Sequence, residues 1–139
     1  MRPLVHPAVA AVTVEAILHA LSDPVRAALF AAIVDADAAT SCSRLVTVAG
    51  RTVAKSSLSQ HLKVLRDAGL IHGERRGVEV LNTSRAAEID DRFPGLIAAI
   101  LAAHRAQTRG TPATRGRAAT ARRHRQQPRL RVNRRRRKR

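Results

Sequence analysis

The sequence predicts a mainly α-helical domain that carries one small β-hairpin and is followed by a disordered basic tail. Three observations lead to this fold class. Apolar residues recur at helical spacing in several segments between residues 12 and 104. One stretch, 70–84, alternates in the manner of two short strands. Residues 104–139 lack apolar periodicity and contain 15 Lys and Arg without a single acid.

The first half of the chain predicts three helices in order. Residues 12–21 can form the first. Asp23 and Pro24 supply an N-cap and a first helical position for the second. A shorter third helix is expected at about 41–49, with Gly50 in the turn that follows. The apolar face of the second helix comes from Leu29, Phe30, Ile33 and Val34.

The next helix, in "KSSLSQHLKVLRDAGLI", has one apolar face and one small polar face over residues 55–68, with Gly69 at its end. On a helical wheel the apolar arc holds Leu58, Leu62, Leu65 and Ala68. The opposite arc holds Lys55, Ser56, Ser59, Gln60, Lys63, Arg66 and Asp67. Such a row of donors and acceptors suits base edges and phosphates in a DNA major groove. An ordinary amphipathic surface helix is the alternative.

A β-hairpin is predicted directly after this helix, in "LIHGERRGVEVLNTS". Its tip carries Arg75 and Arg76 beside Gly77. A hairpin that follows a recognition-type helix is the wing of a winged helix-turn-helix domain. We expect the two arginines to lie along phosphates or in the minor groove.

In this order, "LSDPVR", "KSSLSQHLKVLRDAGLI" and "RRGVEVLN" resemble the ArsR family of bacterial winged-helix repressors over residues 13–103. The resemblance implies a homodimer that binds operator DNA. Two departures are a longer segment at 45–59 and Ala54 in place of a capping serine. The resemblance also implies the residues that face the major groove, which are Lys55, Ser56, Ser57, Ser59, Gln60 and Lys63.

A terminal helix at 90–104 is similar to the one that pairs with the first helix in the dimer interface of some of these repressors. Its apolar stripe is one that so small a monomer would struggle to cover. The expected interface combines this stripe with the first helix, through Leu96, Ile97, Ile100 and Leu101 and through Val14, Ile17 and Leu18.

The net charge of +16 is distributed unevenly. Residues 1–103 contain 11 Lys and Arg against 10 acids, whereas 104–139 have a net charge of +15. We expect this tail to be disordered, because it cannot bury enough apolar surface, and residues 1–12 to be flexible. The tail is either a sequence-independent nucleic-acid arm or a product of compositional drift or a shifted reading frame. The arm reading supports an alternative function, a non-specific nucleoid-type DNA-binding protein.

Other function classes lack their motifs. No apolar run reaches membrane-spanning length, and no catalytic motif is present, so neither a membrane protein nor an enzyme is expected. The single cysteine, Cys42, excludes an intramolecular disulfide and fits a cytoplasmic setting. It is either a redox sensor at a helix start or a small buried apolar residue. We expect no metal and no cofactor, and no motif indicates an inducer.

Overall fold

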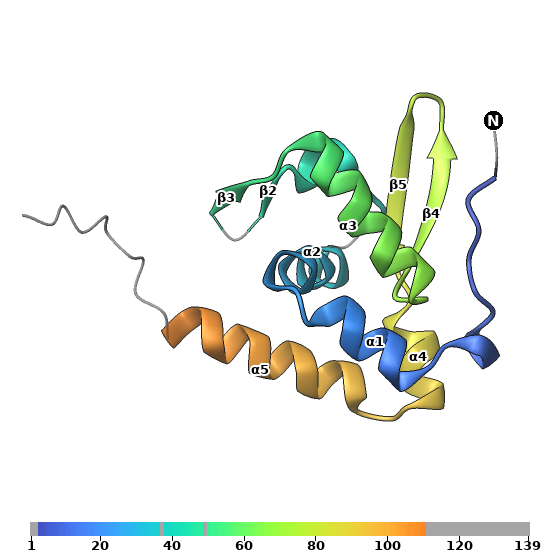
Figure 1. Ribbon diagram of the computed structural model, residues 1–139, viewed down its shortest axis with the longest axis vertical. Helices are drawn as coiled ribbons and strands as arrows, with labels where there is room; N and C mark the ends of the chain where they lie inside the picture. Colours follow the sequence, from blue (N-terminus) through green and yellow to red (C-terminus); the bar gives the residue numbers. More distant parts are fainter. Residues whose placement is uncertain (1–2, 37, 49, 111–139) are drawn as a thin grey trace, which may run out of the picture.

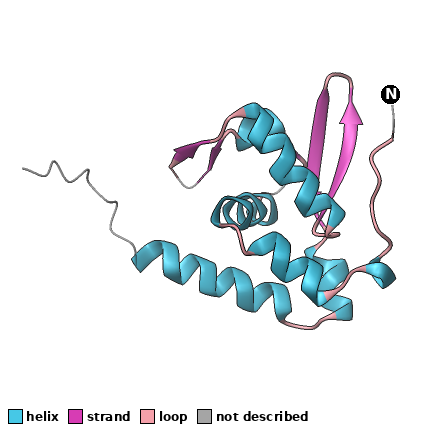
Figure 2. Ribbon diagram, in the orientation of Figure 1, coloured by secondary structure: helices cyan, strands magenta, loops and turns pink. Residues whose placement is uncertain are grey.

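Helices make up most of the computed structural model, which describes residues 3–36, 38–48 and 50–110 (Figures 1 and 2). In the part of the chain that the structure describes, two small antiparallel sheets lie at the edges of a group of α-helices, so the predicted mainly α-helical domain with a hairpin wing is confirmed. The elements, in chain order, are η1 (Val9–Ala11), α1 (Val14–Leu21), α2 (Pro24–Asp35), β1 (Thr40–Ser41), η2 (Cys42–Leu45), β2 (Thr47–Val48), β3 (Arg51–Thr52), α3 (Lys55–Asp67), β4 (Ile71–Arg76), β5 (Glu79–Ser84), α4 (Ala86–Arg92) and α5 (Leu96–Gly110).

The start of α2 forms as the sequence predicts. The carboxylate of Asp23 accepts hydrogen bonds from the backbone N–H groups of Val25 and Arg26, at 2.8 and 3.0 Å, and Pro24 occupies the first turn. The Arg26 guanidinium reaches back and donates to the carbonyl of Ala20 at 2.6 Å. This cap therefore also holds the corner between α1 and α2.

The prediction of a helix at 41–49 is wrong. Only the single 3-10 turn η2 forms, and a second hairpin, β2–β3, follows it around Gly50, whose φ is +72°. The residues on both sides of this turn are mostly β-branched, which favours extended backbone over helix. Val48 anchors the hairpin because its side chain is buried, and α2 is the helix that β2 contacts. The small hairpin lies within the segment 45–59.

Helix α3 and the wing agree with the sequence prediction. The apolar arc of α3 is buried, from Leu58 at 1% exposed to Ala68 at 6%. Gly69 ends the helix with φ +80°, a backbone conformation that favours glycine. A Cβ at this position would also lie 2.4 Å from a methyl group of Val12, so the packing requires glycine as well. Strands β4 and β5 pair from Ile71 opposite Ser84 to Arg76 opposite Glu79. The sheet order is β1-β5-β4, which leaves β4 at the edge.

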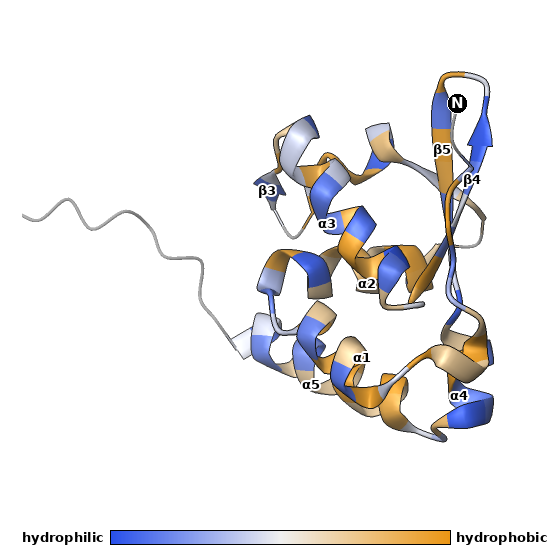
Figure 3. Cartoon of the chain, turned by 45° about the vertical axis from the view of Figure 1, so that its right-hand side comes forward, coloured by the Kyte–Doolittle hydropathy of each residue, from blue (hydrophilic) through white to orange (hydrophobic). Residues whose placement is uncertain are grey.

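One hydrophobic core joins the five α-helices with η2, β2 and the start of β4, and Figure 3 shows apolar residues along α1 and α2. Each fully buried large side chain contributes about 1.5–3 kcal/mol relative to an exposed one. Among the described residues, Phe30 is the one aromatic side chain buried in this core, and the partly buried Phe93 packs against it. Its largest fully buried apolar residues are Phe30, Ile17, Leu29, Leu45, Leu58, Leu65, Leu70, Ile71 and Ile89.

Residues 3–12, which we call the N-terminal arm, are the described part of the N-terminus, and the flexibility expected there stays a prediction. The arm contains the turn η1 and runs beside the wing, and Val12 is 3% exposed (Figure 1). Arg85 donates to the carbonyl of Pro7 at 2.9 Å, and Arg92 donates to that of Val9 at 2.7 Å. These partners are about 80 residues away, which a local reading of the sequence could not find.

The expected terminal helix is two helices. Helix α4 ends before Pro94 and Gly95, and Gly95 has φ +77°, so the chain turns there into α5. Helix α5 continues to Gly110 and is tied to α2 through Arg105, whose guanidinium lies 2.5 Å from the Asp35 carboxylate. Residues 104–110 are therefore helical rather than part of the tail. The disorder predicted for 111–139 lies outside the described residues.

Within residues 3–36, 38–48 and 50–110, no single helix is long and apolar enough to cross a membrane. Helices α1 and α2 reach the required length and hydropathy only as a pair, and a bend of 105° separates them.

Candidate DNA-binding surface

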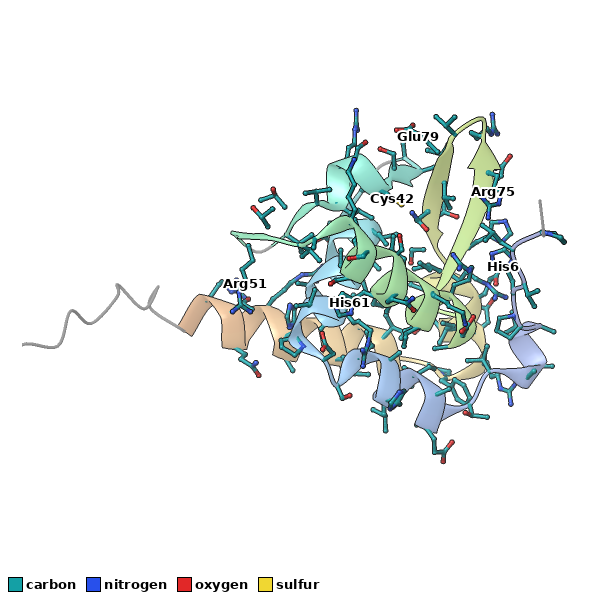
Figure 4. The ribbon with its side chains drawn as sticks, turned by 45° about the horizontal axis from the view of Figure 1, so that its top comes forward. His6, Cys42, Arg51, His61, Arg75 and Glu79 are labelled. Atoms are coloured by element: carbon teal, nitrogen blue, oxygen red, sulfur yellow. The ribbon has the colours of Figure 1, made fainter. Side chains whose placement is uncertain are left out.

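The polar face of α3 is free of the core. All six side chains expected at the major groove are exposed to solvent, while the apolar arc on the other side of the helix is buried. Helix α3 lies between the β2–β3 hairpin and the β4–β5 wing in both views of the molecule (Figures 1 and 4). The helix can therefore be approached by a large partner without rearrangement of the core. These residues are Lys55, Ser56, Ser57, Ser59, Gln60 and Lys63.

The charge around this face is one-sided. Residues 38–66, which run from the end of α2 through η2, the small hairpin and α3, contain five Lys and Arg and no Asp or Glu. All 10 acids of the chain lie outside this stretch. The net charge of residues 1–103 is close to zero and therefore hides this asymmetry. The positions of the charged residues in the sequence already show it. A surface with cations and no acid is the electrostatic requirement for approach to phosphates.

One acid borders the polar face. The Lys63 ammonium lies 2.5 Å from the carboxylate of Asp67, one turn further along α3, and both side chains are more than half exposed. An exposed pair of this kind is worth at most about 1 kcal/mol of stability. Lys63 can therefore exchange this partner for a phosphate at little cost.

The wing tip presents mixed chemistry. Arg76 donates from Nε to Glu74 at 2.9 Å, whereas Arg75 has no ion pair among the residues that the structure describes. Gly77 has φ +61° and allows a tight turn, which leaves the neighbouring Val78 side chain fully exposed. Of the two predicted arginines, Arg75 is thus the one available at once to a phosphate.

Asn82 supports the wing from behind. Its side chain is fully buried, and Nδ2 donates to the carbonyls of Thr40 on β1 at 3.3 Å and of Val80 at 3.4 Å. Cys42 packs at the same place, with Sγ 3.9 Å from Nδ2 of Asn82. The half-buried thiol is a packing neighbour of the sheet. Among the described residues, no group of three or more metal-ligating side chains comes together.

The seven residues expected at a dimer interface divide into two sets. Ile17, Ile97 and Leu101 are at most 4% exposed and belong to the core of a single chain, because α5 packs on the chain's own helices. Leu18, by contrast, is 51% exposed. Half-buried side chains make up the rest of the set, which is Val14, Leu96 and Ile100. Two of the four residues of the α5 stripe, Ile97 and Leu101, are therefore covered by the chain itself.

Comparison with protein-family models agrees with the helix-turn-helix part of this architecture. Residues 21–74, from the end of α1 into β4, match a family model described as a helix-turn-helix domain. The solved structures include a similar chain, an ArsR-like transcriptional regulator from Rhodococcus sp. RHA1, with 24% identity and a TM-score of 0.47. The similarity covers 67% of this chain and 86% of that chain. No curated protein matches.

The helix-turn-helix match, the exposed polar face of α3 and the wing define a class of protein: a winged helix-turn-helix DNA-binding regulator of transcription. Within that class, the order of its motifs resembles that of the ArsR family.

Proposed function

We propose that this chain is a sequence-specific repressor that binds an operator as a homodimer in the cytoplasm. Helix α3 enters the major groove, and the wing follows the sugar-phosphate backbone beside it. The observation that carries the proposal is the exposed polar face of α3 within the acid-free stretch 38–66. Regulation follows from occupation of the operator, so the chain acts by binding rather than by catalysis.

Each side chain of the face has a role that its chemistry supports. The Gln60 amide can donate to and accept from an adenine edge at once, and the hydroxyl of Ser59 can donate to or accept from a base edge. Lys63 and Lys55 contribute point charges to phosphates on the groove walls. Arg75 extends the phosphate contacts to the wing side.

The homodimer is proposed on the exposed part of the expected interface. Leu18 on α1 is an exposed large apolar side chain, and half-buried Ile100 on α5 belongs to the same expected set. A two-fold pairing through these helices would place two copies of α3 on one face of DNA, which requires a palindromic operator.

A second candidate function rests on a different observation, the charge of +15 in residues 104–139. In this alternative the chain binds nucleic acid without sequence preference, through counterion release along the phosphate backbone.

The test compares two changes in their effect on DNA binding, the loss of one side chain on α3 and the deletion of the tail. Fragments selected from random duplex DNA by the full chain should converge on a palindrome. On that operator and on a scrambled duplex, Gln60→Ala should narrow the difference in affinity by about 1–3 kcal/mol without changing the salt dependence. Deletion of residues 111–139 should weaken binding to both duplexes and flatten the salt dependence, while the operator preference stays.

Gln107→Ala, which changes an exposed side chain of α5, is the matched control and should bind DNA like the unmodified chain. The measurement is fluorescence anisotropy at several salt concentrations. If Gln60→Ala has no effect and tail deletion removes all binding, the repressor proposal fails and the non-specific function stands.

A further inference from the structure

A pair of histidines joins the N-terminal arm to the edge of the wing. The imidazole of His6 stacks on that of His72, with ring centroids 4.1 Å apart and an angle of 24° between the planes. Nε2 of His6 accepts a hydrogen bond from the backbone N–H of Gly73 at 2.9 Å. Figure 4 shows His6 beside strand β4, on the side away from α3.

The bond to Gly73 closes an open sheet edge. Strand β4 is the outer strand of the sheet, and the backbone groups of an edge strand need partners other than a further strand. The arm packs directly on bare backbone here, because a Cβ on Gly73 would lie 3.1 Å from Cδ1 of Leu4 and 3.4 Å from Nη1 of Arg66. The arm therefore covers the base of the wing through Leu4 and His6.

The bond requires a neutral imidazole. An imidazole nitrogen accepts a hydrogen bond only when it carries no proton, and both nitrogens are donors in the charged ring. Protonation of Nε2 would thus remove the acceptor and bring the new N–H of His6 against the backbone N–H of Gly73.

The charged and titratable groups that face His6 oppose its protonation. Among the described residues they are His72 on β4, Arg66 on α3 and Arg85 before α4, and all are bases. Burial of the ring lowers the pKa of His6, and the repulsion of His72, Arg66 and Arg85 lowers it further. The docked arm and the charged ring are therefore incompatible on two counts, the lost acceptor and the crowding of positive charge.

We propose that His6 is a pH-sensitive latch, which holds the N-terminal arm against strand β4 while the ring is neutral and releases it when the ring is protonated. The rest of the arm stays anchored at its far end, where Arg85 and Arg92 donate hydrogen bonds to the carbonyls of Pro7 and Val9. Release is thus confined to residues 3–6 and to the edge of the wing.

The direction follows from proton linkage. A histidine whose pKa is lower in the docked state contributes stability that is fully present above its ordinary pKa of about 6.5. That stability is lost as the pH falls through the lowered pKa of His6. The wing then loses its cover on the β4 side. A change of DNA affinity with pH is the consequence, and only this last step rests on the proposed function.

The test follows the full chain by amide and imidazole NMR between pH 8 and pH 5. We expect the Gly73 amide to shift with the same midpoint as the His6 ring, below pH 6.5, and the Leu4 and Val5 amides to become mobile over the same range. In His6→Gln this response of Gly73 should be lost, because glutamine does not titrate. In His19→Gln, a matched change of an exposed histidine on α1, the response of the Gly73 amide should remain.

The latch is overturned if the Gly73 amide stays in place while His6 titrates, or if His6→Gln keeps the response of the unmodified chain. A second measurement separates the latch from the proposed function. Anisotropy on a random 20-base-pair duplex at pH 8 and pH 5.5 should show a pH response that His6→Gln reduces. A latch seen by NMR without any DNA binding would contradict the proposed function and leave the latch standing.

Discussion

Lys63 and Asp67 form an ion pair of 2.5 Å on the solvent side of α3, at the end of a stretch that otherwise has no acid. Asp67→Asn removes the only carboxylate of α3 and frees the ammonium of Lys63. We expect DNA affinity to rise a few-fold for all sequences, with a salt dependence steeper by up to about one unit of slope. Anisotropy titrations at several salt concentrations measure both quantities.

Glu15→Gln is the control for this change, because it removes one exposed acid from α1, away from α3. An equal gain in both variants would assign the effect to net charge alone rather than to the face of α3.

The start of α3 lacks a side-chain cap. Ala54 occupies the N-cap position with extended backbone, φ −60° and ψ 141°, and no side-chain hydrogen bond reaches the first turn. Ala54→Ser should stabilise the protein by about 1 kcal/mol, because the hydroxyl can accept from a free N–H of that turn. Urea unfolding measures the gain. Ala54→Val, which adds volume without an acceptor, should give none, and a gain from valine would refute capping as the cause.

The opposite change is expected at α2, where the cap exists. Asp23→Ala should destabilise the protein by about 1 kcal/mol at pH 7, whereas Asp23→Asn should retain most of the cap. Urea unfolding at pH 7 compares the three proteins. Equal stability of all three would show that the hydrogen bonds of Asp23 to Val25 and Arg26 contribute nothing.

The same cap predicts a pH dependence. Burial alone would raise the pKa of Asp23, but the backbone N–H bonds from Arg26 and Val25 and the Arg26 charge outweigh it, so the pKa lies below its ordinary value. The stability from the charged form is therefore present above about pH 3.9 and is lost as the pH falls through the lowered pKa. The advantage of the unmodified chain over Asp23→Asn should shrink from pH 7 to pH 3. An advantage that is constant with pH would contradict this assignment.

The proposed dimer predicts a response to charge at Leu18. Leu18→Glu places a carboxylate on a side chain that is already 51% exposed, so the single chain should remain folded. We expect monomers in sedimentation experiments and weaker binding to a palindromic duplex. Val5→Glu is the matched control, since Val5 is an exposed aliphatic residue of the N-terminal arm, at 77%. Unchanged sedimentation of Leu18→Glu would remove this face from the interface.

Several features that the sequence does not reveal arise from contacts between groups far apart along the chain. The N-terminal arm is hydrogen-bonded to Gly73, Arg85 and Arg92, and the composition of residues 3–12 indicates none of these partners. Likewise, the apolar stripe of α5 suggests an interface, yet Ile97 and Leu101 are covered by the chain itself. Helical periodicity shows that a face is buried but carries no information on what buries it.

The sequence by itself determined the elements whose causes are local. The Asp23-Pro24 cap, the 3.6-residue spacing of leucines in α3, the stop at Gly69 and the two-residue turn at Gly77 each act within a few residues, so their positions were readable. The exposed polar face of α3 follows from the same spacing.

Only the tertiary structure decided the rest. The β-branched residues around Gly50 favour extended backbone, but the pairing of β2 with β3 and the burial of Val48 on a strand that contacts α2 are tertiary features. His6 becomes a group of interest only because folding brings it to Gly73 and among three bases. Such outcomes depend on contacts between segments that are far apart in the sequence. The free energy of these contacts is gained only when the whole core assembles, so a local sequence pattern does not indicate them.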